Sequence, residues 1–275
     1  MKWFIVALAI VVSLSGIGRD AWAWGDEGHK VICEKAFRLV QPSTRTEIQR
    51  LIKTDTEFHR FSDSCIWPDH PRQRAAEHFV NLARDSRGLS ADGDMCPRAQ
   101  ECVLSAIQVE LAYLNSNGGD DEAKLAALKF LGHWVGDVHQ PLHVSFEDDR
   151  GGNGVLVTGE CGTSNLHSTW DTCLVAKAVG ADVGEAATEL MKSITPAKIQ
   201  GWTQTEPKDW ANESFAIAEQ AQTKYCTRQG TSCNKPTGKV TIDAAYVAAN
   251  TPIVREQLQK AGVRLAHMLD AALAR

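Results

Sequence analysis

The sequence predicts an all-α fold: a single, mostly helical domain with a small β-hairpin, preceded by an amino-terminal leader. Three observations predict it. Apolar residues recur at helical spacing through most of the chain. No internal repeat, low-complexity tract or Pro/Gly/Ser-rich linker divides the sequence. Its 275 residues also suffice for one well-buried core.

Residues 1–23 have the pattern of a secretory signal peptide. Lys2 precedes an almost wholly apolar run over Phe4–Leu14, and the tripeptide AWA at 21–23 offers the small residues that a signal peptidase reads. The run has about a dozen residues, fewer than the roughly 20 of a membrane helix, which disfavours the alternative of an uncleaved anchor. Cleavage there makes Trp24 the start of a mature domain over residues 24–275.

Helical patterns follow one another along the mature chain. One helix is predicted over Glu101–Asn115, ended by the turn sequence NSNGG. Asp120 or Asp121 can cap the next helix, whose apolar stripe continues to Val138 and which ends before Pro141. The segment GGNGVLVTGE, at 151–160, predicts the β-hairpin. Further helical patterns cover 165–179, 182–193, 207–225 and 243–274, with a kink or a boundary at Thr251-Pro252 in the last.

Eight cysteines in an exported chain favour disulfides over free thiols. Eight cysteines allow 105 pairings, so other connectivities stay open. No CxxC occurs, which argues against thiolate metal sites. Three short intervals predict local pairs, with one pair left over: Cys96–Cys102, Cys161–Cys173, Cys226–Cys233 and the remaining Cys33–Cys65.

The charge balance excludes broad, non-specific attraction of nucleic acid. The chain has 29 basic and 34 acidic side chains, a formal net charge of −5. Loss of residues 1–23 removes two basic residues and one acidic residue, leaving 27 against 33 and a charge of −6. An acidic protein lacks the basic surface of such binders, so a phosphate ligand needs local basic groups or bound metal.

Histidine and aspartate pairs are the strongest chemical signal. In HWVGDVHQPLH, His133 and Asp137 are four residues apart, so a helix places them on one face. His167 and Asp171 repeat this spacing. A single such pair is more often a surface pair than a metal site.

Isolated polar residues in apolar segments strengthen the metal interpretation. Asp69 stands in CIWPDHPR, His78 in EHFVNL, and His143 follows Pro141, where the helix has ended. Burying such side chains costs several kcal/mol each unless they are paired or coordinated. Nitrogen and carboxylate ligands without thiolate suit zinc, and a cluster this large indicates a multinuclear catalytic site.

Six motifs occur in the order found in one family. WGDEGH from Trp24, WPD, HFVN, HWVGDVHQPLH, GGN and NLHSTWD resemble the secreted zinc-dependent single-strand nucleases of the S1/P1 family. They span residues 24–171, and the remainder fits the family only as a helical scaffold. The resemblance implies a phospholipase C/nuclease-like helical fold with three zinc ions in a cleft.

The resemblance also divides nine residues among the three ions and gives Asp69 and Asp137 a catalytic role. The first ion would be held by Asp69, His78, His133 and Asp137; the second by the amine and carbonyl of Trp24, His29 and the shared Asp137; the third by His143, His167 and Asp171.

The implied reaction is hydrolysis of phosphodiester bonds in single-stranded DNA and RNA by a metal-bound hydroxide. It leaves 5′-phosphates and is often accompanied by 3′-nucleotidase activity. Phe79 resembles a base-stacking residue and Asn81 a polar base contact, while Arg72 is a candidate phosphate contact. The alternatives are a core position for Phe79 and a capping or solvated role for the other two. We expect a monomeric, secreted or periplasmic enzyme without a membrane anchor.

Two alternative functions remain at this point. A zinc-dependent phospholipase C shares the fold and nearly all the ligands, including an amino-terminal tryptophan. Its last ligand is typically glutamate, whereas this chain has Asp171. A non-catalytic exported zinc-binding protein would have closed, interchangeable sites. The ordered mixture of His and Asp, together with the base-stacking candidate, counts against it.

Overall fold

The computed structural model describes residues 24–116, 118–229 and 232–274. The predicted leader lies outside the described residues. The described part is mostly helical and its strands are three residues long, which confirms the predicted fold class. Its helices are α1 (Asp26–Leu39), α2 (Pro42–Ile52), α3 (Phe61–Ser64), α4 (Val103–Asn115), α5 (Asp121–Val138), α6 (Leu166–Ser168), α7 (Leu174–Val179), α8 (Val183–Met191), α9 (Pro196–Trp202), α10 (Pro207–Ala218) and α11 (Ala244–Leu273).

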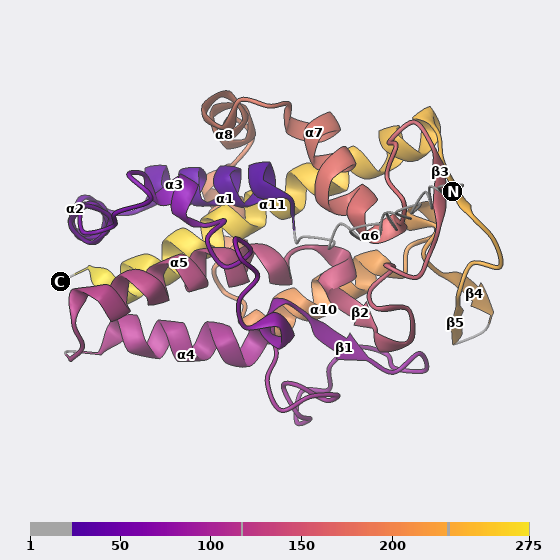
Figure 1. Ribbon diagram of the computed structural model, residues 1–275, viewed down its shortest axis with the longest axis horizontal. Helices are drawn as coiled ribbons and strands as arrows, with labels where there is room; N and C mark the ends of the chain where they lie inside the picture. Colours follow the sequence, from indigo (N-terminus) through magenta and orange to yellow (C-terminus); the bar gives the residue numbers. More distant parts are fainter. Residues whose placement is uncertain (1–23, 117, 230–231, 275) are drawn as a thin grey trace, which may run out of the picture.

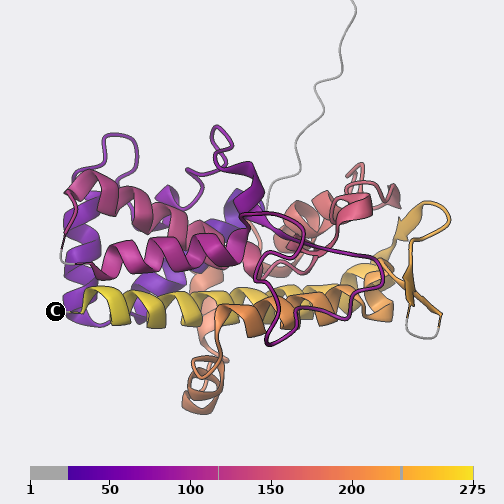
Figure 2. The same cartoon turned by 90° about the horizontal axis from the view of Figure 1, so that it is seen from below.

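Helix α11 is the central support of the fold and runs along the length of the molecule (Figures 1 and 2). It packs against α1, α4, α5 and α7. Val254, Leu258, Ala261, Leu265 and Leu269 recur every three or four residues and are all fully buried. The helix continues through Pro252, so the alternative of a boundary at Thr251-Pro252 is wrong.

Helix α5 has the cap that the sequence predicts. The Asp120 carboxylate accepts a hydrogen bond from the Ala123 amide at 2.8 Å, and the helix ends at Val138, ahead of Pro141. The helix predicted over 207–225 is shorter, because α10 ends at Ala218.

Two glycines on α5 allow α1 to approach closely. A Cβ at Gly132 would lie 2.6 Å from Cys65 Sγ, and one at Gly136 would lie 2.6 Å from the His29 Nδ1 atom. Both distances are shorter than any ordinary contact. Glycine at these positions therefore permits the close packing, and Gly136 sets how near His29 of α1 comes to α5.

The β-hairpin predicted over 151–160 does not form there. Only β3 (Val157–Gly159) forms there, and it pairs in parallel with β6 (Val240–Ile242). The reason is local: Gly151 and Gly152 have φ values of +62° and +82° and turn the chain before any second strand can form. The antiparallel pair lies elsewhere, between β4 (Thr227–Gln229) and β5 (Ser232–Asn234).

A short parallel pair joins two segments that carry predicted ligands. Strand β1 (Val80–Leu82) follows His78, and β2 (Val144–Phe146) follows His143. In this parallel pair, Val80 of β1 lies opposite Val144 of β2. The pairing therefore brings the two histidines together from distant parts of the sequence.

The eight cysteines form four disulfides, in the pairs that the spacing predicts. Cys33–Cys65 is fully buried and ties α1 to the segment before Asp69. Cys161–Cys173 ties the loop after β3 to the helical turn that carries Asp171. Within the described ranges, no helix combines the length and apolar character needed to span a membrane.

Candidate metal centre

The predicted ligand side chains gather in one buried cluster. They come from α1, α5, α6 and the loop after α3, from the 3₁₀ turns Ala75–His78 and Pro141–His143, and from the π-helical turn Thr169–Cys173. The most exposed of them keeps only 6% of its accessible surface. The eight side chains are His29, Asp69, His78, His133, Asp137, His143, His167 and Asp171.

The first predicted group has the spacing of a tetrahedral metal site. Ligand atoms at about 2.0–2.2 Å from a tetrahedral zinc lie about 3.3–3.6 Å from one another. The His78 Nδ1 atom is 3.6 Å from an Asp69 oxygen, 3.1 Å from Asp137 Oδ2 and 3.3 Å from His133 Nε2. His133 Nε2 is 3.6 Å from Asp69 and 3.4 Å from Asp137. The donors of His78, His133 and Asp137 therefore form one compact group, and the Asp69 carboxylate lies 3.6 Å from each of the two histidines.

Backbone carbonyls fix the tautomers of these histidines. A carbonyl oxygen can only accept, so the ring nitrogen facing it carries the proton and the other nitrogen presents a lone pair. Four of the predicted ligand histidines have such a bond, and each directs its lone pair into the cluster, an orientation typical of metal ligands. The donations are His78 Nε2 to Gln73 at 2.9 Å, His133 Nδ1 to Cys65 at 2.7 Å, His143 Nδ1 to His78 at 2.5 Å and His167 Nδ1 to Gly151 at 2.6 Å.

The cluster is electrostatically incomplete without a cation. Burial lowers the pKa of His78 to about 3 and that of His133 well below its usual value, so both rings are neutral at neutral pH. Burial raises the pKa of Asp69 to about 6 and that of Asp137 well above its usual value. Lone pairs and carboxylates thus face one another in a dry environment. A bound metal ion would offset the free-energy cost of burying these polar groups.

Several buried acceptor atoms also lack a hydrogen-bond donor among the described residues. They are Asp69 Oδ1, both carboxylate oxygens of Asp137, His143 Nε2 and Asp171 Oδ2. Orphaned acceptors are rare in protein interiors. Their convergence on one region fits metal ligation.

Asp137 faces two of the predicted ligand groups. One of its oxygens faces His78 and His133, while the other lies 3.3 Å from His29 Nε2. The His29 ring stacks on His133 with centroids 3.8 Å apart. Ligand atoms of His29 also gather within 4.8 Å of those of Asp69 and His133.

Trp24 begins the described chain and lies at the same centre. Its side chain is fully buried, and a Cβ on Gly28 would be only 2.8 Å from Trp24 Cβ, so a tight turn holds it against α1. The next residue, Gly25, donates its amide to the Asp171 carbonyl at 2.7 Å. The start of the predicted mature chain is thus tied to the backbone of a predicted ligand.

The third predicted group lies beside the first two. Ligand atoms of His143, His167 and Asp171 gather within 4.8 Å, and His167 Nε2 is 3.3 Å from Asp171 Oδ2. The other Asp171 oxygen accepts a hydrogen bond from the Gln140 amide at 2.6 Å. Sequence analysis did not single out Gln140, although it lies within the HWVGDVHQPLH motif.

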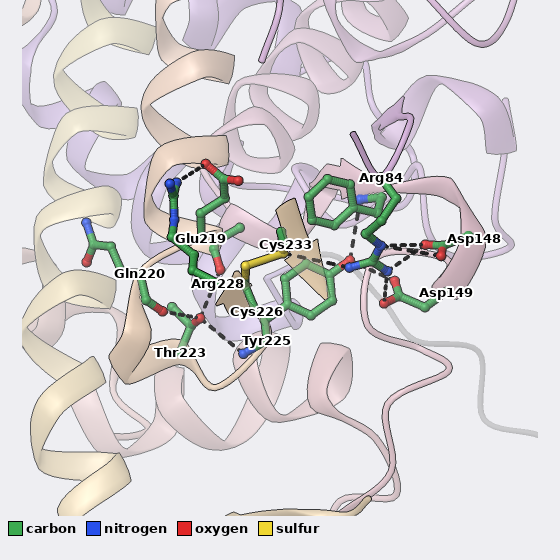
Figure 3. Close-up of a disulfide and its surroundings, with 12 residues drawn as sticks. Arg84, Asp148, Asp149, Glu219, Gln220, Thr223, Tyr225, Cys226, Arg228 and Cys233 are labelled. Atoms are coloured by element: carbon green, nitrogen blue, oxygen red, sulfur yellow. Dashed lines mark hydrogen bonds and ion pairs between the residues drawn. A yellow bond between two sulfur atoms is a disulfide. The ribbon is translucent and has the colours of Figure 1, made fainter. Parts of the chain in front are cut away.

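Asp149 and its partners hold the turn at Gly151-Gly152, where the Gly151 carbonyl accepts a hydrogen bond from His167. The Asp149 carboxylate accepts hydrogen bonds from the Gly152 amide at 2.9 Å and from the Tyr225 hydroxyl at 2.7 Å. Arg84 pairs with the other Asp149 oxygen at 2.6 Å (Figure 3). Sequence analysis missed this network, because its members are distant in sequence and match no local pattern.

The disulfide drawn in Figure 3 is not a metal site. Glu219 lies beside Cys226 and Cys233, but the two sulfurs are bonded to each other and offer no thiolate. His139 is likewise structural. Its Nδ1 donates to the Val135 carbonyl and its Nε2 accepts from Arg264.

A cleft of about 810 Å³ opens over the third group. His143 and His167 line it together with all three residues predicted to contact substrate, Arg72, Phe79 and Asn81. Phe79 is half-buried, so it borders the cleft and does not fill a core position. Among the described lining residues there is no Asp or Glu, although the chain as a whole is acidic.

Comparison with known proteins gives one consistent result. A family model described as S1/P1 Nuclease matches residues 24–274. The chain is 29% identical to Nuclease S1 of Aspergillus oryzae, over 96% of each chain. It is 26% identical to Endonuclease 5 of Arabidopsis thaliana, covering 98% of this chain and 96% of that one. With Nuclease P1 of Penicillium citrinum the identity is 25%, over 90% of this chain and 97% of that one.

Proposed function

The chain belongs to the S1/P1 nuclease family, and on this premise we propose that it is a zinc-dependent endonuclease of single-stranded DNA and RNA. The products carry 5′-phosphates, and the same site hydrolyses 3′-nucleotides. One observation carries the proposal: eight buried His and Asp side chains form three adjacent groups with acceptor atoms at metal-ligand spacing.

The ligand sets are those given by the family resemblance. Asp69, His78, His133 and Asp137 would hold the first ion. His29, Asp137 and the amine and carbonyl of Trp24 would hold the second, and His143, His167 and Asp171 would hold the third. Zinc bound there supplies Lewis acidity, neutralises phosphoryl charge and lowers the pKa of bound water. The all-nitrogen-and-oxygen donor set, held by fixed tautomers, suits this metal.

The chain's own side chains bind and orient the substrate. Arg72 lines the cleft with His143 and His167, and its backbone pairs with that of Asp69, so it is placed to contact a phosphate near the ions. Phe79 offers a ring for base stacking, worth about 1–3 kcal/mol per base, and Asn81 can hydrogen-bond a base edge. A duplex hides base faces, so these contacts favour single strands.

Export completes the centre in this proposal. Four disulfides suit an oxidising compartment, either the periplasm or the medium. Removal of residues 1–23 would free the Trp24 amine as a ligand, and the mature chain would act as a monomer. A chain retaining one extra amino-terminal residue should therefore load the second zinc poorly.

A substrate panel tests the function. Mature, zinc-loaded protein is assayed on single-stranded DNA, RNA, duplex DNA, a 3′-nucleotide and phosphatidylcholine. We expect hydrolysis of both single-stranded polymers and of the 3′-nucleotide. Phosphatidylcholine turnover alone would favour the phospholipase alternative, and no turnover with full zinc would favour the non-catalytic one. Asp137→Asn should abolish activity and reduce bound zinc. The exposed Asp92→Asn is the matched control.

A further inference from the structure

Arg150 is a second cation on the cleft that neither the sequence motifs nor the ligand assignments use. It lines the same 810 Å³ cleft as Arg72, His143 and His167. Its side chain is exposed, whereas His143 and His167 are 1% and 6% exposed. The cleft thus has a buried floor of predicted ligands, and Arg150 stands at its solvent-facing rim.

The acidic residues beside Arg150 are already occupied by other cations. Three carboxylates precede it directly in the sequence, at positions 147–149, and each pairs with a basic side chain other than Arg150 (Figure 3 shows Arg84 with two of them). Within the described part of the chain, no carboxylate pairs with Arg150 itself. The pairs are Glu147 with Arg98 at 2.8 Å, Asp148 with Arg84 at 2.5 Å and with Lys235 at 3.1 Å, and Asp149 with Arg84 at 2.6 Å.

The backbone of Arg150 is held in a conformation that does not suit arginine. Its φ and ψ are +54° and +51°, a left-handed region that glycine or asparagine adopts at lower cost. Its amide donates to the Glu147 carbonyl at 3.0 Å, and its own carbonyl accepts from the Asn153 amide and side chain at 3.2 and 2.8 Å. These hydrogen bonds therefore fix the backbone that carries the arginine, against its local preference. Such strain is typical of functional positions.

The two cations of the cleft serve different positions. Arg72 is only partly exposed, and its backbone pairs with that of the predicted ligand Asp69, which places it near the floor. Arg150 is exposed at the rim, next to Gly151, whose carbonyl orients His167. A 3′-nucleotide has one phosphate, which the floor accommodates. A strand has further phosphates that must leave the cleft across its rim.

We propose that Arg150 binds a phosphate of the strand adjacent to the one that is cleaved, and that it thereby favours polynucleotides over 3′-nucleotides. This inference rests on the proposed function and deepens it, because it names the feature that separates the two substrate classes. The ligand chemistry is a phosphodiester of single-stranded nucleic acid, recognised by charge and not by base sequence.

The test compares three variants of the zinc-loaded mature protein. Arg150→Gln removes the charge, Arg150→Lys keeps it, and Lys53→Gln removes one charge from the exposed end of α2, which lies at the opposite end of the molecule from α6 (Figure 1). Steady-state kinetics are measured on a single-stranded oligonucleotide and on a 3′-nucleotide. Fluorescence anisotropy gives the oligonucleotide Kd as a function of salt and needs no turnover.

We expect Arg150→Gln to raise the oligonucleotide KM and Kd about tenfold, with kcat within about twofold of the wild type. Its kcat/KM on the 3′-nucleotide should stay within about twofold. The slope of log Kd against log salt should become shallower by about 0.7, the value for one lost single-strand phosphate contact. Arg150→Lys should recover most of the affinity, and Lys53→Gln should match the wild type.

Two kinds of result overturn the inference. Equal losses on both substrates would mean that Arg150 supports the metal centre and not the strand. An unchanged Kd and salt slope, or a wild type that does not bind the oligonucleotide, would remove the contact altogether. Failure of the proposed function is a separate outcome, since it appears as an absence of hydrolysis by the wild type on both substrates.

Discussion

Gly136→Ala is expected to remove one zinc while leaving the protein folded. The new Cβ would lie 2.6 Å from His29 Nδ1 and 2.8 Å from His29 Cε1. Ordinary contact begins at 3.4 Å, so the imidazole must retreat by 0.8 Å to relieve the shorter contact. Ligands of a working site are held to within about 0.5 Å, and a misplacement of about 1 Å can cost about a hundredfold in rate.

The effect on stability should be much smaller than the effect on metal. Alanine in a helix is favoured over glycine by about 0.8–1.0 kcal/mol, while overpacking costs about 1–3 kcal/mol. The two partly cancel, so the free energy of unfolding of the metal-free protein should fall by roughly 0–2 kcal/mol. The loss at His29 is not offset, because its ring is buried and stacked on the His133 ring.

Metal analysis of dialysed protein, with thermal unfolding and single-strand hydrolysis in parallel, measures this directly. We expect two zinc equivalents in place of three and about a hundredfold lower turnover. Gly201→Ala in α9 is the control, because a Cβ there meets no atom within 4 Å. If Gly136→Ala kept three equivalents and wild-type turnover, His29 would not be a ligand and the assignment of the second ion would be wrong.

Three further predictions concern the metal centre. Gln140→Leu removes the amide that holds Asp171, so affinity for the third zinc should fall about tenfold or more in a chelator competition, whereas exposed Gln200→Leu should have no effect. Burial raises the Asp69 pKa to about 6, so below that pH a proton must be displaced for metal to bind; zinc retention should fall as the pH drops through 6, and retention unchanged down to pH 4 would contradict this. Chelation should lower Tm by several degrees, because the ligands tie together α1, α5 and α6, and an unchanged Tm would show that the fold does not depend on the metal.

Local signals in the sequence predicted the helices well and the strands poorly. The cap at Asp120 and the apolar stripe of α5 depend on neighbouring residues, and the structure has both. Strand β3 pairs with β6, more than 80 positions away, so no local pattern could reveal it. The predicted hairpin is absent because Gly151 and Gly152 turn the chain there, and the Gly151 carbonyl accepts a hydrogen bond from His167.

Some residues of the candidate centre were predictable from local spacing, and others depend on long-range contacts. The His133–Asp137 and His167–Asp171 pairs follow from helical spacing alone, but the meeting of His78 with His143 depends on the pairing of β1 with β2. Supporting residues such as Gln140 and Asp149 are chemically ordinary, and only their contacts reveal them. Arg150 is visible as a candidate only once its acidic neighbours are seen to pair elsewhere.

The most direct test of the account is a crystal structure of the mature chain with an anomalous difference map recorded at the zinc absorption edge. We expect three peaks: one between His78 and His133, one beside His29 and the Trp24 amine, and one between His143 and His167. Asp137 should contact the first two. A single peak, or peaks outside these three groups, would contradict the trinuclear centre on which the proposed function depends.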